Sequence, residues 1–296
     1  MNRSTLVLVL ATMIVGTAAA DVSTGIERAD ELQEAERYEE QMELLEETLE
    51  DASNSTERAE VYWRMSRATL GIGDLAADAG APDDELIATY EEAEGYADQA
   101  IEADSNNHNG YFYKSANIGK AGQVRGVLNS LVSAAPMRDL LEQTITKDPD
   151  YAPAYFVLGQ LYAQVPGVIS FGNDDYAVSF ARKSIDLHEA ELDSGVEDEM
   201  AYDYYVQLAS HLIERDWNER KRNREHDDKR RAFQSTSDPL ERHFHYEGMV
   251  DIPDVNDTDE AEQILDRMIS LLQGIRTRSA AQDRHLALAL ELQSAL

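Results

Sequence analysis

Apolar residues along the chain recur three and four positions apart, and no segment alternates convincingly between apolar and polar residues. The first spacing places apolar side chains on one face of an α-helix, whereas alternation is typical of a half-buried strand. The sequence therefore predicts an all-α fold. We expect helices over residues 25–37, 39–52, 56–70, 84–103, 109–122, 136–147, 152–164, 174–188, 198–233, 258–273 and 280–294.

Short turns between these helices indicate a repeating helical hairpin. The clearest unit has residues 155–162 as its first helix and residues 177–185 as its second. The small residues Gly159 and Ala177 would let the two backbones approach closely, while Leu158 would fill the space between neighbouring hairpins.

Weaker units precede and follow this one, which gives about four to five hairpins. We expect second helices around Met42–Leu49, Ala93–Ile101 and Met137–Ile145, and first helices around Trp63–Leu70, Tyr111–Ile118 and Tyr205–Leu212. Residues Gly126–Pro136 and Val165–Gly172 exceed a regular unit and are interpreted as insertions in turns. Such insertions either provide contact sites on one side of the array or merely cover an end of the core.

On these motifs, residues 25–215 resemble the tetratricopeptide repeat (TPR) superfamily. The resemblance implies a TPR-like right-handed solenoid with irregular insertions, whose concave face binds peptides or proteins. A C-terminal helical extension would follow it.

Within the superfamily, the chain resembles the exported T component (TatT-like) of TRAP transporters. The shared features are a signal peptide, an irregular array, and the helix 155–162 running into Val165-Pro166-Gly167. This resemblance implies an accessory ligand-handling role beside a periplasmic substrate-binding protein. The regulator-of-microtubule-dynamics proteins have a related layout around residues 63–67 and 117–122, but the bacterial-looking signal sequence argues against them.

Four segments are expected along the chain. Arg3, the apolar run Leu6–Val15 and the small residues Ala18–Ala20 predict a signal peptide cleaved after Ala20, and hence a periplasmic or secreted protein without a later membrane span. We assign residues 1–20 to this signal, 21–235 to the repeat domain, 236–257 to a polar linker and 258–296 to a C-terminal helical segment.

Composition adds two constraints. The chain has no cysteine, so disulfides contribute nothing to its fold. Once Arg3 is removed, 58 acidic residues stand against 25 basic ones, which argues against a nucleic-acid partner. The acidity reflects either a saline habitat or a basic partner.

The phase of the first helices predicts a binding groove, although ordinary packing explains the same side chains. The expected groove residues are Asn109, Phe112, Ala116, Lys120, Phe156, Gln160, Gln164, Val206, Ser210 and Glu214.

No constellation in the sequence meets the demands of catalysis, and no phosphate-binding or dinucleotide-binding motif is present. We therefore expect no enzyme activity and no cofactor. The best metal candidate is the stretch Glu241–Glu247 with His243 and His245, which a polar linker explains equally well. The mixed charges of Arg215–Arg231 predict a long solvated helix, which also offers a surface for self-association.

The sequence therefore favours an exported scaffold that binds a protein partner. The alternative is the ligand-handling accessory of a TRAP-type transporter.

Overall fold

The computed structural model describes residues 22–296 apart from Ile169 and Asp198, and every regular element in this part of the chain is a helix. The predicted signal peptide lies outside the described residues. The helices are α1 Val22–Glu34, α2 Tyr38–Asp51, α3 Ser55–Asp78, α4 Asp83–Ala103, α5 His108–Val124, α6 Val127–Lys147, α7 Ala152–Gln164, α8 Asp174–Ser194, α9 Tyr202–Arg215, α10 Glu219–Ser235, α11 Pro239–His243, the 3₁₀-helix η1 Tyr246–Met249, α12 Asp257–Gly274 and α13 Ala280–Ala295.

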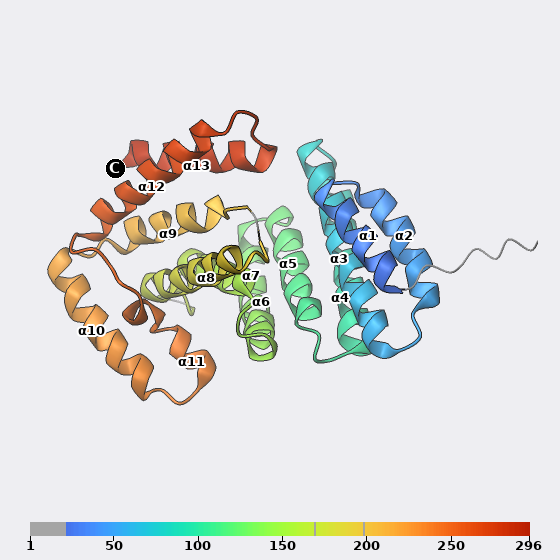
Figure 1. Cartoon of the computed structure of the whole chain (residues 1–296), viewed down its shortest axis with the longest axis horizontal. Coiled ribbons are helices and arrows are strands. Elements are labelled where there is room, and N and C mark those ends of the chain that lie inside the picture. Colours follow the sequence, from blue (N-terminus) through green and yellow to red (C-terminus); the bar gives the residue numbers. More distant parts are fainter. Residues whose placement is uncertain (1–21, 169, 198) are drawn as a thin grey trace, which may run out of the picture.

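Consecutive helices form hairpins that pack side by side. The first four pair α1 with α2, α3 with α4, α5 with α6 and α7 with α8, and each hairpin contacts the next (Figure 1). The fifth pairs α9 with α12, and α13 packs on both. The all-α, TPR-like prediction is therefore confirmed.

The unit that the sequence predicts most clearly is the hairpin of α7 and α8. Tyr155 and Leu158 are fully buried, as the stacking of hairpins requires. A Cβ added at Gly159 would lie 3.4 Å from the carbonyl oxygen of Ala177 and 3.2 Å from Gln207 Nε2. Glycine thus allows α7 to approach both α8 and α9, as its position in the motif indicated.

The hairpin of α3 and α4 is packed mainly through small side chains. Ala68, Ala93, Ala97 and Ala100 are all fully buried. Alanine has no rotamer freedom to lose, so it favours the helix and lets the two backbones lie close together. The close contact of α3 and α4 therefore needs no large apolar side chains at these four positions.

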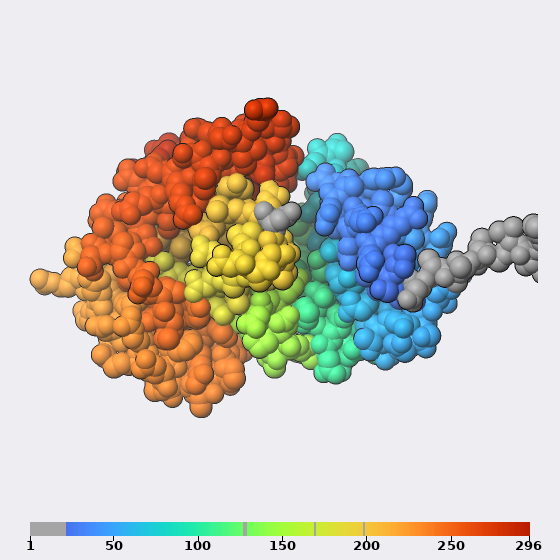
Figure 2. Space-filling view, viewed as in Figure 1, coloured from blue at the N-terminus to red at the C-terminus, as the bar shows by residue number. Residues whose placement is uncertain are grey.

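The array curves so that its last helix returns towards its first half. Arg284 on α13 lies 3.9 Å from Asp78 at the end of α3, although the two residues are far apart in sequence. Figure 1 shows the start of α13, in red, opposite the cyan end of α3. The surface between them is hollowed (Figure 2).

Several predicted boundaries are wrong, and α3, expected to end at residue 70, continues to Asp78. Residues 127–135 continue α6 and are not a turn insertion, because the helix accommodates Pro136 in its interior. Proline removes one backbone hydrogen bond but need not end a helix. The predicted helix 198–233 is broken at Asp216, which adopts a left-handed conformation with φ 46°, so α9 and α10 point in different directions.

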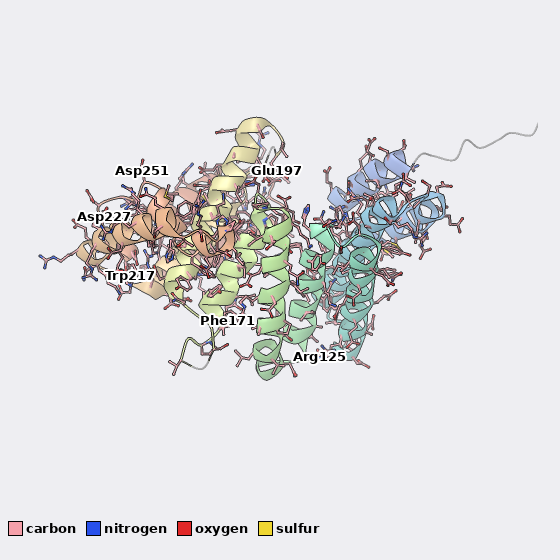
Figure 3. All side chains as sticks on the ribbon, turned by 90° about the horizontal axis from the view of Figure 1, so that it is seen from below. Arg125, Phe171, Glu197, Trp217, Asp227 and Asp251 are labelled. Carbon is pink, nitrogen blue, oxygen red and sulfur yellow. The ribbon has the colours of Figure 1, made fainter. Side chains whose placement is uncertain are left out.

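The predicted polar linker 236–257 is folded and packed. It contains α11 and η1, and together with α10 it forms an excursion between α9 and its partner α12. Figure 3 shows Trp217, Asp227 and Asp251 of this excursion at the end of the molecule opposite α1 and α2. The C-terminal segment does not stand apart either, because α12 completes the fifth hairpin.

Candidate interaction surface

Charged side chains gather in the interior where the excursion meets the array. We call this group the buried charge cluster. Its members, four cations and four carboxylates, are Asp175, Arg182, Arg215, Arg222, Lys229, Glu247, Asp257 and Glu260.

Glu247 on η1 is the centre of the cluster. It is 2% exposed and accepts hydrogen bonds from Arg182 Nε at 3.1 Å, Arg215 Nη1 at 2.6 Å and Lys229 Nζ at 2.7 Å. Arg215 also donates to Asp257 from Nε and Nη2, both at 2.8 Å. These bonds join α8, α9, α10, η1 and α12.

The charges of the cluster compensate one another. Burial alone would raise the pKa of Glu247, but Lys229, Arg215 and Arg182 outweigh it and hold that pKa well below its ordinary value. With four charges of each sign the cluster is neutral, so it offers little to a ligand. Its role is to fasten the excursion to the array.

Most of α10 is exposed, as the sequence predicts for a solvated helix, but Arg222 and Lys229 are buried. Together with Arg215 at the end of α9, they are paired with distant carboxylates and not with neighbours on their own helix. These three cations are therefore not available to a second copy of the chain.

A cavity of about 500 Å³ opens where the starts of α7, α9 and α13 meet the end of α8. We call it the α13 pocket. Four carboxylates line it, namely those of Glu191, Glu197, Glu199 and Asp203. Figure 3 shows Glu197 towards one edge of the molecule, whereas Arg125 and Phe171, in the turns after α5 and α7, lie at the opposite edge.

The carboxylates of the α13 pocket differ from those of the buried charge cluster. Within the described part of the chain, none of the four lies within 4.0 Å of a lysine or arginine nitrogen. Burial raises the pKa of Asp203, and the nearby His285 lowers that pKa by less than burial raises it. Burial likewise raises the pKa of Glu191, and the nearby charge of Glu197 adds to the effect.

Aromatic and imidazole rings hold the wall of the pocket in place. Tyr204 stacks on Phe156 with ring centroids 4.6 Å apart, and the His188 ring meets its edge at 5.6 Å. The backbone N–H of Ala201 donates to His188 Nε2 at 2.9 Å. The turn between α8 and α9 is thereby fixed to the end of α8.

The ten predicted groove residues do not form one site. Val206 is 1% exposed and lies in the core, because it faces α12 across the fifth hairpin, so its prediction as a groove residue is wrong. Phe156 packs behind Tyr204, and Lys120 is paired with Asp74 at 2.7 Å. Half-buried positions are taken by Asn109, Phe112, Ala116, Gln160 and Ser210, and exposed ones by Gln164 and Glu214.

Gln164 lines a second, mainly apolar cavity of about 400 Å³ between α5, α6 and α7. Except for Val206, the groove assignment stays a prediction.

The metal candidate 241–247 is dispersed by the fold. Glu247 points into the buried charge cluster, whereas His243 Nε2 lies 3.1 Å from the Tyr155 hydroxyl. Burial lowers the pKa of His243 to about 4, helped by Lys183 and Arg242. Among the residues with described positions, no group of three or more histidine, aspartate or glutamate side chains is placed to hold a metal ion.

Sequence reasoning missed the acidic lining of the α13 pocket. The stretch Glu191–Glu199 is densely acidic, which is a signal that could have been noticed. The contribution of α13 could not have been noticed in the sequence, because the α10–η1 excursion separates α9 from the helices that pack on it.

This chain is a TPR-like helical-repeat protein on the strength of its paired and stacked hairpins. The family model "Regulator of microtubule dynamics protein 1-3" matches residues 25–168, just under half of the chain. The match covers the stretches 63–67 and 117–122, in which the sequence resembles these proteins. A resemblance to the TRAP-transporter T component is not shown. No match is found among curated proteins.

Several solved structures are similar at low identity. A crystal structure of MamA protein shares 13% identity at a TM-score of 0.37, covering 65% of this chain and 81% of that one. The MamA RS-1 ArsTM double mutant shares 16% at 0.41, covering 84% and 99%. YrrB, a TPR protein with an unusual peptide-binding site, shares 18% at 0.26, covering 60% and 93%.

No helix of the described chain is long and apolar enough to cross a membrane.

Proposed function

We propose that this chain is an exported scaffold that holds a partner protein, with the α13 pocket as part of the contact surface. One observation carries the proposal. The pocket combines polar side chains of α13 with carboxylates of α8, of the turn after it and of α9 that form no ion pair with a lysine or arginine in the described chain. Pockets that combine apolar walls with a few convergent polar groups are typical binding sites.

Export rests on the pattern of Arg3, Leu6–Val15 and Ala18–Ala20. N-terminal sequencing of the protein from its native host tests it. Asp21 is the expected first residue, whereas an intact N-terminus in the cytosolic fraction would contradict export.

Site-specific photo-cross-linking tests the contact surface. A cross-linker is placed in the full chain at Tyr202, which lines the pocket, and in a matched variant at Arg224, an exposed residue of α10. We expect one discrete partner adduct from Tyr202 and none from Arg224. The absence of an adduct at Tyr202, or the same adducts at both positions, would contradict the proposal.

The identity of that partner also tests the accessory role in a TRAP-type transporter, which stays a prediction. A periplasmic substrate-binding protein as the adduct would support this role, and a different partner would argue against it.

A further inference from the structure

We propose that the mainly apolar cavity between α5, α6 and α7 binds a small uncharged organic molecule, whose apolar body lies inside and whose hydrogen-bonding group lies at the opening. We call this cavity of about 400 Å³ the α6 cavity. The inference goes beyond the proposed function, because the α6 cavity shares no lining residue with the α13 pocket and needs no protein partner.

The cavity exists because α6 lies close to α5 but packs much less extensively on α7. Two glycines of α5 allow the close approach. A Cβ added at Gly119 would lie 2.6 Å from Met137 Cε, and one added at Gly122 would lie 3.2 Å from Ser133 Oγ. Glycine at these positions removes the side chains that would hold the two helices apart. Space therefore remains where α7 meets the pair.

Short side chains leave this space unfilled. The small lining residues on α6 and just before it are Gly126, Ser130, Ser133 and Ala134. On α7 and directly after it, the apolar side chains of Leu161 and Val165 are 8% and 5% exposed and form a buried wall. Protein interiors are normally close-packed, and the lining of an empty apolar space lacks dispersion contacts. A ligand of matching shape supplies those contacts.

The polar groups of the cavity lie at its opening. Gln123 and Gln164 line the cavity, are exposed, and belong to the last turns of α5 and α7. A carboxamide both donates and accepts hydrogen bonds, so this pair suits a hydroxyl or amide group of a ligand. Apolar walls with a few convergent polar groups are the usual anatomy of a small-molecule site.

The lining favours an uncharged ligand over an ion. No described residue that lines the cavity has an ionisable side chain. A charged group that entered would lose its hydration without meeting an opposite charge, which is costly. An apolar molecule, in contrast, gains free energy when it leaves water. A volume of about 400 Å³ falls within the range of organic-ligand sites and is far larger than one water molecule needs.

The α6 cavity and the α13 pocket lie at different edges of the molecule. The lining of the α6 cavity includes Gly126 and Val165, in the turns after α5 and α7. Figure 3 shows Arg125 and Phe171 of these turns at the edge opposite Glu197. A ligand in the α6 cavity therefore leaves the α13 pocket open, and the two sites can be tested separately.

Fluorescence of N-phenyl-1-naphthylamine tests the proposal on the mature full chain. This uncharged aromatic probe becomes brighter when it moves from water into an apolar site. We expect saturable binding of about one probe molecule per chain. The competitor 1-octanol should displace the probe at least about tenfold more effectively than octanoate or octylammonium, because these carry a charge on an alkyl chain of the same length.

A variant that fills the cavity locates the bound probe. Ala134 is 2% exposed and lines the cavity, whereas its neighbour Ala135 is exposed and does not line it. We expect Ala134→Leu to weaken the probe at least about tenfold, and the matched control Ala135→Leu to weaken it less than about twofold. Thermal unfolding should show Ala134→Leu to be at least as stable as the control, because the added side chain occupies empty space.

A second matched pair serves if Ala134→Leu does not fold. Leu131 is half-buried and lines the cavity, whereas Val132 beside it is 77% exposed and does not. Leu131→Phe should weaken the probe at least about fivefold, and Val132→Phe less than about twofold. At the opening, Gln123→Leu/Gln164→Leu should weaken 1-octanol about threefold, because it removes hydrogen-bonding groups and leaves the apolar wall intact.

Three results would overturn the inference. Non-saturable binding, or equal losses in a cavity variant and its control, would show adsorption to the surface. Octanoate that competes as well as 1-octanol would contradict the uncharged class of ligand. Unchanged affinity for 1-octanol in Gln123→Leu/Gln164→Leu would contradict the placement of the hydrogen-bonding group. The cross-link at Tyr202 should be the same with and without 1-octanol, so a negative result here leaves the proposed function as it stands.

Discussion

Carboxylates gather at two places in this molecule, and lysine or arginine side chains compensate their charge at only one of the two. In the buried charge cluster, Glu247 and Asp257 are enclosed by guanidinium and ammonium groups that cancel their charge. In the α13 pocket, Asp203 and Glu191 are also partly buried, yet no lysine or arginine in the described chain lies within ion-pair distance. The pKa of Glu247 is lowered, whereas those of Asp203 and Glu191 are raised.

This difference separates a structural use of charge from a functional one. A paired buried carboxylate stabilises the fold as long as all its partners remain, because removing one leaves an uncompensated charge. An unpaired carboxylate costs stability in the free protein and is retained where a ligand supplies the missing cation. The comparison makes three predictions, which differ in size and in sign.

The largest effect is expected for Glu247→Ala. The substitution leaves Arg182, Arg215 and Lys229 buried without their shared carboxylate. We expect a loss of about 3–5 kcal/mol in the free energy of unfolding, measured by urea denaturation. Hydrogen exchange should locate the greatest loss of protection in residues 216–256.

The matched control is Glu241→Ala, an exposed glutamate of the same excursion. It should change stability by less than about 0.5 kcal/mol. If Glu247→Ala cost no more than this control, the cluster would not fasten the excursion to the array.

The fold was largely predictable from the sequence, and the reason is local. The spacing of apolar residues and the motif around Gly159 specify each hairpin without reference to distant parts of the chain. The excursion was not predictable, because the role of Glu247 depends on Arg182 and Arg215, which are distant from it in sequence. In addition, the excursion from α10 to η1 separates α9 from its partner α12 along the chain.

The candidate site was hardly predictable for the same physical reason. Its lining comes from α7, α8, α9 and α13, and the helix that closes it is placed by long-range packing. The groove residues predicted from the phase of single helices include Phe156, which supports the pocket wall, but not Asp203.

The second prediction concerns pH. As the pH falls, Asp203 and Glu191 take up protons before carboxylates of ordinary pKa, since their own pKa values are raised. NMR titration of the side-chain carboxyl carbons should therefore show Asp203 and Glu191 taking up protons at a higher pH than free aspartate and glutamate.

The array should stay folded over the pH range of this titration. A group whose pKa is depressed in the folded state keeps its contribution to stability until the pH falls through that depressed value, and the pKa of Glu247 is held well below the ordinary one. Far-UV circular dichroism at each pH checks this. A loss of helicity over the same pH range would mean acid unfolding, and would remove the distinction between the two groups of carboxylates.

The smallest effect is expected for Asp203→Asn, and its sign is the sharpest test of the comparison. Burial disfavours the charge of Asp203, so its removal should raise the free energy of unfolding at neutral pH, by less than about 1 kcal/mol. The gain is small because Asp203 is the second residue of α9, where a negative charge interacts favourably with the helix dipole.

Asp84→Asn provides the matched control, because Asp84 is the second residue of α4 and is exposed. There the same substitution removes only the favourable interaction with the helix dipole, so stability should fall slightly. Thermal unfolding of both variants at neutral pH measures the two signs. If Asp203→Asn also lowered stability, the charge in the α13 pocket would be contributing to the fold, and the case for reserving it for a ligand would be lost.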